Sequence, residues 1–472
     1  MLLLLVATSA AAVPLSYEEA LRRAAGSAGS VATAEVDVRV AEASLLAARA
    51  PYEPTASASG SYFSSTSEGA GQFGRFFAET SGWSAELGVR QVLASGTALD
   101  VGLSSSESRF LYRLAEVDTE FTDDPQFESR LSVTLSQALL QGHRLGWNLR
   151  QVRAATNARD LAELSLDTRR QQAVADAARA FWQARYQRAL VDIARRTLAL
   201  TEEQARVTEA LVDAGRLAAV ESTRTEAAVV QARRATLEAE SAAAAADDTL
   251  LVLVGERPGS GLELLPPPLR TPPETAFDEA SLVETVLRGN PELRAARASV
   301  EHRDAELRDA RHALLPELGA TASGSLRGYE PSLGAAMGEL ASGDLGDWSV
   351  GGTLSVPLLN RADRASVDSA SAELERARIA VRQLEDNLAT QARAQVRTLR
   401  TASEDVALAR ANVELAEATL TAEQARLAEG RALQRDVGEA IRALDQARID
   451  AERAVTSWTV ALVELDRLKG GL

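Results

Sequence analysis

The sequence predicts an α+β membrane protein in which strands from several chains form a β-barrel that is continuous with a long α-helical coiled coil. Three observations support this fold class: a tandem repeat, polar strand-like runs that follow a proline in each copy, and long helical stretches without proline. Only 4% of the 472 residues are aromatic, which is little for large globular cores. Stretches rich in Ala, Leu, Glu and Arg favour extended helices packed along narrow stripes.

The chain begins with a short apolar run, "MLLLLVATSAAAVP". A membrane-spanning helix needs about twenty apolar residues, so residues 1–12 are predicted to be a secretory signal peptide cut near Ala12. A buried N-terminal helix stays open as the alternative, because the basic segment of a typical signal is missing. The sequence contains no Cys, which excludes disulfides and a lipid-anchored cysteine.

Two parts of the chain repeat each other. A shift of 262 residues aligns apolar positions of 31–54 with those of 293–316, at the spacing of a coiled-coil seam. A shift of 215 residues aligns Gly215 with Gly430 and the segment "QAR" at 231–233 with "QAR" at 446–448. The chain is therefore predicted to be a tandem duplication.

Each repeat is predicted to hold a helix, a strand region and a long helical hairpin. The predicted boundaries are a first repeat over 13–265 (helix 17–53, strand region 55–142, helical hairpin 143–254), a Pro-rich connector at 266–276, and a second repeat over 277–472 (helix 278–315, strand region 317–360, helical hairpin 361–470). A helical rod of about 65 residues at 1.5 Å each would be on the order of 100 Å long.

The first repeat is longer than the second by 262 minus 215, or 47 residues, and this excess lies in its strand region. The segment "TLSQALLQ" at 134–141 reappears as "TLSVPLLN" at 353–360, so nearly all of the insertion precedes Thr134. The second copy has room for two strands and the first for four. Each run is near the nine to eleven residues of a tilted membrane strand.

Aromatic residues distinguish a membrane barrel from a soluble β-sandwich. Of the 20 aromatic residues, 12 fall in the two strand regions, toward strand ends and loops, where the interfacial girdles of a barrel lie. A soluble sandwich, the alternative, would place them at inward positions in the middle of strands. At most six strands cannot close around an aqueous lumen, so several chains must contribute.

Four residues mark the predicted junctions between helices and strands. The helices are expected to enter the barrel through Pro54 and Pro316 and to leave it near Gly142 and Asn360. The net charge of −16 argues against a nucleic-acid partner.

These features together resemble the TolC family of outer-membrane efflux channels over essentially the whole chain. The signal, the tandem repeat, the strand ends "TLSQALLQG" and "TLSVPLLN", and the hairpin turns "VDAGRLAAVES" and "AEGRALQRDVGEA" carry the resemblance. It implies a homotrimer with a β-barrel in the lipid of the outer membrane and an α-barrel that crosses the periplasm toward an adaptor protein and an inner-membrane pump. The implied function is passive conduction in efflux or type I secretion. A periplasmic coiled-coil adaptor or scaffold without a pore is the alternative.

The first strand region departs from this family, which usually has four strands per chain. We expect the excess residues to form an additional β-hairpin that turns at Ala94 to Gly96. If both of its strands join the barrel, a trimer has eighteen strands; if they fold back outside the wall, it has twelve.

An enzymatic function is not expected, and neither is a cofactor or a metal. The segment "GAGQFG" at 69–74 has the glycine spacing of a dinucleotide-binding loop, but it opens no helix and is interpreted as an extracellular loop. The only histidines are His143, His302 and His312, whose positions suit neither a metal pair nor a general base.

The turns of the two helical hairpins are candidate contact sites for an adaptor. Small residues near the turns offer shallow grooves for a partner's helical tip: Ala214, Gly215, Ala218 and Gly430. The alternative is that these residues only reverse the chain.

The resemblance also implies an acidic aperture at the periplasmic end. Glu221 matches an acid of the family's gating network, and Asp436 and Glu439 match the two acids that line the closed aperture. Asp436 and Glu439 are three residues apart, so they share one helix face, and threefold symmetry would repeat them as two acidic rings. Arg431 or Arg435 is expected either to pair with Glu221 on the neighbouring hairpin or to lie at a solvated helix end.

Overall fold

The computed structural model of this protein describes residues 13–71, 74–114, 119–122, 124–266, 278–429 and 431–471. The predicted signal peptide at 1–12, Gly430, and all but the first residue of the predicted connector at 266–276 lie outside the described residues. The chain divides into two compact units. We call them the helical unit, which comprises 1–39, 161–299 and 378–472, and the strand unit, which comprises 40–160 and 300–377.

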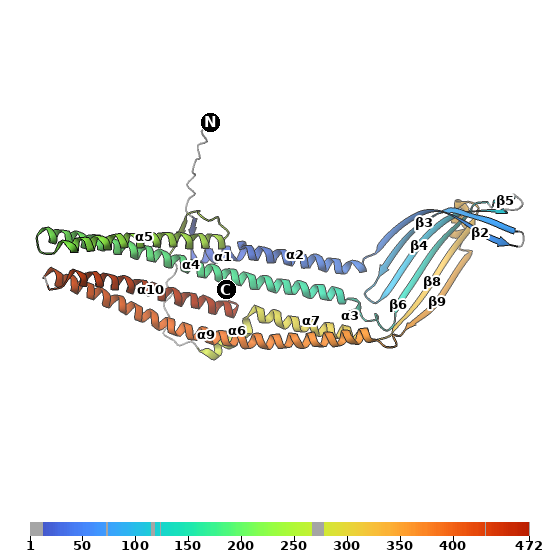
Figure 1. Cartoon of the computed structure of the whole chain (residues 1–472). Coiled ribbons are helices and arrows are strands. Elements are labelled where there is room, and N and C mark those ends of the chain that lie inside the picture. Colours follow the sequence, from blue (N-terminus) through green and yellow to red (C-terminus); the bar gives the residue numbers. More distant parts are fainter. Residues whose placement is uncertain are drawn as a thin grey trace, which may run out of the picture. The chain divides into compact units, whose positions relative to one another are not determined.

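The helical unit is built on two long antiparallel hairpins (Figure 1). Its elements are β1 (Val13–Leu15), α1 (Tyr17–Ser27), the start of α2 (Gly29–Arg49), most of α4 (Arg150–Asp213), α5 (Ala219–Leu253), β7 (Leu262–Leu264), α6 (Glu279–Gly289), the start of α7 (Pro291–Ala313), most of α9 (Arg361–Ala428) and α10 (Gln434–Lys469). No proline interrupts α4, α5, α9 or α10, and their abundant Ala, Leu, Glu and Arg favour helix. Of the described helices, none combines the length and the apolar composition that crossing a membrane requires.

The structure corrects the prediction of single helices over 17–53 and 278–315, because each is divided in two. Ala28 separates α1 from α2, and Asn290 separates α6 from α7. The Asn290 side chain accepts the N–H of the third residue of α7, and Pro291 is the first residue of that helix. This pair is a strong signal for a helix start, which the continuous apolar spacing of the sequence had obscured.

A buried cluster holds the N-terminal segment against the first helical hairpin. Leu15 on β1, Phe181 on α4 and Leu250 on α5 are fully buried within it. The Tyr17 ring meets the Phe181 ring edge-on, with a centroid distance of 5.4 Å. β1 also pairs in parallel with β7, so strand pairing and side-chain packing both fix this segment. The sequence did not predict this two-stranded sheet.

The strand unit is one curved antiparallel sheet (Figure 1). Its described strands are β2 (Thr55–Gly71), β3 (Gly74–Val92), β4 (Thr97–Leu114), β5 (Thr119–Thr122), β6 (Gln126–Ala138), β8 (Glu317–Glu330) and β9 (Leu345–Ser355). The hydrogen-bonded order is β2-β3-β4-β6-β8-β9, and the short β5 pairs with β4 beside this path. The unit also contains a 3₁₀ turn (Ala50–Tyr52), the short helix α3 (Leu145–Asn148), and α8 (Leu333–Ser342), which joins β8 to β9.

The structure confirms the additional hairpin in the first copy. β3 and β4 pair in antiparallel fashion, and the pair nearest the turn is Val92 opposite Ala98. The turn between the two strands contains Ala94 to Gly96. The Leu93 N–H donates to the Thr97 carbonyl at 2.8 Å and closes the turn. β2, β3 and β4 have 17, 19 and 18 residues, so they are longer than the predicted nine to eleven. In these three strands the alternating sequence pattern extends beyond the nine to eleven residues that cross a membrane, so the strands continue past that length.

Candidate functional site: strand faces, junctions and hairpin ends

One face of the sheet carries apolar side chains on all six strands of the main path. Directly opposed residues of neighbouring strands lie on the same face, so the register assigns each side chain. One row across this face contains Ala58, Leu87, Leu103, Leu131 and Leu326. The row beside it contains Ala56, Val89, Val101, Val133 and Trp348. We call this surface the apolar face.

The opposite face carries hydroxyl and charged side chains. The row that contains Ser104 is made of Ser59, Glu86, Ser104, Arg130 and Arg327, and we call this surface the polar face. Serines pair across strands on it, with Oγ–Oγ distances of 2.8 Å between Ser61 and Ser84 and between Ser323 and Ser349. A sheet with one apolar and one polar face has the pattern of a membrane barrel wall, with lipid on one side and water on the other.

Ion pairs cross the strands of the polar face. Arg327 lies 2.8 Å from Asp347 and 3.6 Å from Glu128, and Glu128 also pairs with Arg130 at 2.9 Å. These side chains are between a third and two thirds exposed, so solvent screens the pairs and they add little stability. Their effect is to place fixed charges of both signs on the surface that would face the lumen.

Aromatic rings lie on the apolar face at the end of its aliphatic rows, where the first charged side chain appears. Tyr62, Trp83, Glu107 and Phe127 occupy one row, and the Trp83 and Phe127 rings are 6.2 Å apart between centroids. The Trp83 indole N–H donates to the Glu107 carboxylate. Indole rings with an apolar body and a polar edge are typical of the interface between membrane and water.

The junction of strands and helices is held by close backbone contacts around Asn148. Its amide donates to the Ala94 carbonyl at 2.9 Å and to the Gly142 carbonyl at 2.7 Å, so it ties the β3–β4 turn to the chain that leaves β6. Gly96 and Gly142 have φ of +79° and +86°. A Cβ on Gly96 would lie 2.2 Å from the Gly142 carbonyl oxygen, so only glycine fits there.

The other predicted junction residues lie where helices and strands meet. Pro54 follows the 3₁₀ turn and precedes β2, and Pro316 stands between α7 and β8. Asn360 immediately precedes α9, and its φ of +43° is the only positive value of a non-glycine among the described residues. Asn tolerates this conformation better than other side chains, which explains its position at an abrupt start of a helix.

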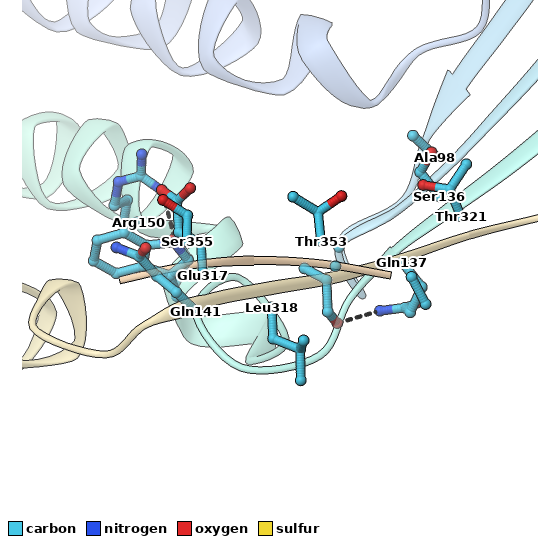
Figure 2. Close-up of a pocket in the computed structure, with 15 residues that line it drawn as sticks. Ala98, Ser136, Gln137, Gln141, Arg150, Glu317, Leu318, Thr321, Thr353 and Ser355 are labelled. Atoms are coloured by element: carbon cyan, nitrogen blue, oxygen red, sulfur yellow. Dashed lines mark hydrogen bonds between the residues drawn. The ribbon is translucent and has the colours of Figure 1, made fainter. Parts of the chain in front are cut away.

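A polar pocket of about 510 Å³ opens at this end of the sheet. Figure 2 shows Arg150, Gln141 and Glu317 gathered at one end of it and Gln137 at the other, with Thr353 between them. The Arg150 guanidinium stacks over the Trp147 ring at 4.4 Å. The pocket is open, and its lining mixes small residues with a few polar and charged side chains, so it does not have the enclosed apolar walls of a typical ligand site.

A second, basic pocket of about 300 Å³ lies between α3, α4 and α7. Arg144 and Arg308 line it together with His312, whose ring packs on Trp147 with a centroid distance of 5.1 Å. Burial lowers the pKa of His312 below its ordinary value, and the nearby Arg144 lowers the pKa further. The lowered pKa favours the uncharged ring, as expected for a histidine with a structural role.

The end of the first helical hairpin is a tight turn after α4. Gly215 adopts a φ of +71°, and its N–H and that of Arg216 donate to carbonyls of the last turn of α4. A Cβ on Gly215 would meet no atom within 4 Å, so conformation rather than space requires glycine. Ala214 lies in the turn, and Ala218 is the N-cap residue of α5. Both alanines are exposed.

A groove of about 500 Å³ lies between α4, α5 and α10 beside the hairpin ends. Its walls include Ala228 and Ala232 of α5 and Gly438 of α10. Two amides in its wall have buried atoms without a hydrogen-bond partner, the Gln204 Nε2 and the Gln434 Oε1, and Gln434 is only 7% exposed. Unsatisfied buried amides favour a partner that supplies hydrogen bonds. Sequence reasoning missed these glutamines, because neither type nor spacing distinguishes them from surface residues.

Each predicted aperture residue has a partner in its own helix or turn. Glu221 pairs with Arg224 at 3.0 Å, and Arg431 pairs with Glu429 at 3.1 Å. Arg435 lies 3.3 Å from Asp436 and 3.5 Å from Glu439. These ion pairs are local to each helix end. Among the described residues of the single chain, neither Arg431 nor Arg435 pairs with Glu221.

Asp436 has a second interaction, which is structural. Its carboxylate accepts the backbone N–H of Leu433, the N-cap residue of α10, at 3.1 Å. An acid at this position stabilises the start of a helix. Glu439 has no such bond among the described residues, and 61% of its side chain is exposed. The two acids thus differ in what their removal would cost the fold.

A family model described as outer membrane efflux protein matches residues 98–256 and 282–471, most of the chain. No sequence among the curated proteins matches it. The chain is similar in structure to CusC (TM-score 0.72, 15% identity, covering 97% of this chain and 92% of CusC). It is also similar to the outer-membrane channel CmeC of Campylobacter jejuni (0.70, 13%, 96% and 85%) and to the outer-membrane protein VceC of Vibrio cholerae (0.70, 15%, 96% and 96%).

Proposed function

Since the chain belongs to the outer membrane efflux protein family, we propose that three copies of it form a passive conduit of an export system, which works with a periplasmic adaptor and an inner-membrane pump. The family places the protein in the outer membrane as an efflux channel. The observation that carries the proposal is the division of the sheet into an apolar and a polar face across every strand of its main path. A scaffold without a pore has no use for such a sheet.

The proposal is tested with the purified full-length chain. We expect an outer-membrane trimer that resists detergent before heating and dissociates on heating to a faster-migrating monomer, and stepwise ion conductance when it is added to planar bilayers. A protein that stays soluble without detergent and conducts nothing would favour the coiled-coil scaffold instead.

We further propose that Asp436 and Glu439 line the narrow periplasmic end of the conduit. Clustered carboxylates around one axis attract cations and bind divalent ions. The double substitution Asp436→Asn and Glu439→Gln removes both charges, while Asn keeps an oxygen that accepts the Leu433 N–H. We expect a several-fold loss of cation over anion selectivity and weaker block by divalent cations in planar bilayers.

Each single substitution serves as a comparison for the double variant. Asp436→Asn removes only the charge, whereas Asp436→Ala also removes the N-terminal hydrogen bond of α10, at a cost of about 1 kcal/mol. Comparing these two variants separates the effect on stability from the effect of charge. Unchanged selectivity in the double variant, with the trimer intact, would exclude these acids from the aperture.

We also propose that the groove beside the hairpin ends receives a helical tip of the adaptor. Its alanine and glycine walls allow close approach, and the amides of Gln204 and Gln434 offer a donor and an acceptor. Filling the groove with Ala228→Trp is expected to reduce pump-dependent export at least tenfold and to leave conductance in planar bilayers unchanged, because the bulk prevents docking but does not enter the conduit.

The matched control is Ala244→Trp, an exposed alanine of α5 that does not line the groove. Trp substitutions at Ala214 and Ala218 test the turn itself. If Ala228→Trp exports normally while the trimer is intact, the adaptor does not use the groove; if the turn variants also export normally, these residues only reverse the chain.

A further inference from the structure

The sheet of one chain has two open edges, and their directions suit pairing with further copies. The path begins at β2 and ends at β9. Successive strands of the path pair in antiparallel fashion, and their number in the described chain is six. Because that number is even, β9 runs opposite to β2, so β9 of one copy can pair in antiparallel fashion with β2 of the next. The alternation of directions then continues around a closed ring.

Neither edge carries the features that keep edge strands apart. β2 contains neither proline nor a basic residue, and its seventeen residues include one acid, Glu68. β9 likewise contains neither proline nor a basic residue, and all eleven of its residues are exposed in the single chain. Monomeric proteins protect such edges with proline, lysine or a covering element. With one acid each, Glu68 on β2 and Asp347 on β9, these edges are suited to pairing with another strand.

The additional hairpin lies inside the sheet rather than beside it. β4 pairs with β6 from Thr97 to Ser108, and β3 pairs with β4 over nearly its whole length. Both strands contribute to the apolar rows through Leu87, Leu103 and their neighbours. A wall without them would need to break these ladders and leave an apolar surface without lipid contact.

We propose that every chain contributes β2, β3, β4, β6, β8 and β9 to the wall, so the trimer closes as an eighteen-stranded barrel through β9–β2 contacts between copies. This inference rests on the trimeric conduit proposed above. Barrel circumference grows with strand number, so at a tilt of about 40° and a spacing of about 4.8 Å the backbone radius is about 18 Å, against about 12 Å for twelve strands. The outer-membrane end then admits larger solutes than a twelve-stranded wall would.

Disulfide cross-linking tests the proposal, and the chain offers a clean background because it contains no cysteine. Residues of directly opposed pairs have Cα atoms about 4.5 to 5.5 Å apart, which suits a disulfide. One cysteine is placed on β9, at Ser349→Cys or Thr353→Cys. The second is placed on β2, in turn at Ser57→Cys, Ser59→Cys and Ser61→Cys. All of these positions lie on the polar face.

The comparison set combines the same β9 cysteines with Ser104→Cys or Ser106→Cys on β4, also on the polar face. β4 would meet β9 of a neighbouring copy only if β2 and β3 lay outside a twelve-stranded wall. In the other twelve-stranded wall, with the additional hairpin of β3 and β4 outside it, β2 would pair with β6, so Ser59→Cys is also combined with Ser132→Cys on the polar face of β6. Ala58→Cys, on the apolar face of β2, controls for random collision. The variants are oxidised in outer-membrane vesicles and separated without reducing agent.

We expect dimer and trimer bands, and no larger product, for at least one β9–β2 combination, and none for the β9–β4 combinations or for Ala58→Cys. Cross-links between β9 and β4, or between β2 and β6, would overturn the eighteen-stranded wall in favour of twelve strands. The absence of every cross-link would overturn closure through β9–β2 contacts. Export by the same variants before oxidation is measured separately. If the unsubstituted chain does not support export, the proposed conduit is contradicted. If only the strand count is wrong, export remains intact.

Discussion

Leu103→Arg is expected to abolish assembly in the outer membrane. Leu103 lies near the middle of the apolar face, directly opposite Leu87 on β3 and Leu131 on β6. A guanidinium on the lipid side of a barrel strand near the bilayer midplane costs about 2–4 kcal/mol per chain, and three symmetric copies repeat that cost. We expect little or no heat-modifiable trimer in outer-membrane fractions and loss of export.

The matched control is Ser104→Arg, one residue along the same strand. Ser104 is opposite Glu86 and Arg130 on the polar face, so the added charge faces water and has an acid beside it. This variant should assemble normally and shift the conductance toward anions. If Leu103→Arg assembles as well as Ser104→Arg does, the assignment of the two faces is wrong.

Phe181→Ala is expected to cause the largest loss of stability in the helical unit. The Phe181 side chain is fully buried and packs in one cluster with Leu15 and Leu250. Deleting a buried phenylalanine ring costs about 3–5 kcal/mol, because the cavity that it leaves refills only in part. The thermal unfolding midpoint of the helical signal should therefore fall markedly in circular dichroism.

Phe181→Leu keeps most of the buried volume and should lower the midpoint much less. Leu237→Ala, on the exposed surface of α5, controls for the loss of apolar area without a cavity, since 62% of Leu237 is exposed. If Phe181→Ala and Leu237→Ala unfold at the same temperature, the cluster does not fix the N-terminal segment.

The sequence already contained the features with a strong local or periodic signal. The long helices α4 and α9 follow from uninterrupted apolar spacing without proline, and the turn of the additional hairpin follows from "ASG" at 94–96. The family was identified from repeat, turns and strand ends, and the match of the family model confirms it. The break at Asn290 has a local signal in the Asn-Pro pair, but the apolar stripe runs through it and through Ala28 without interruption, so the prediction joined the helices.

Composition, periodicity and the repeat thus determined the fold class and the helical and strand segments, because helix and strand signals depend on residues close together in the chain. The resemblance of the repeat, the turns and the strand ends to a known family gave the family. Only the tertiary structure decided which strands are neighbours, which side chains share a face, and which amides of the groove lack a partner. These properties depend on strand register and helix packing between residues far apart in the sequence. A shift of one residue in the register would exchange the apolar and polar faces without changing any local pattern.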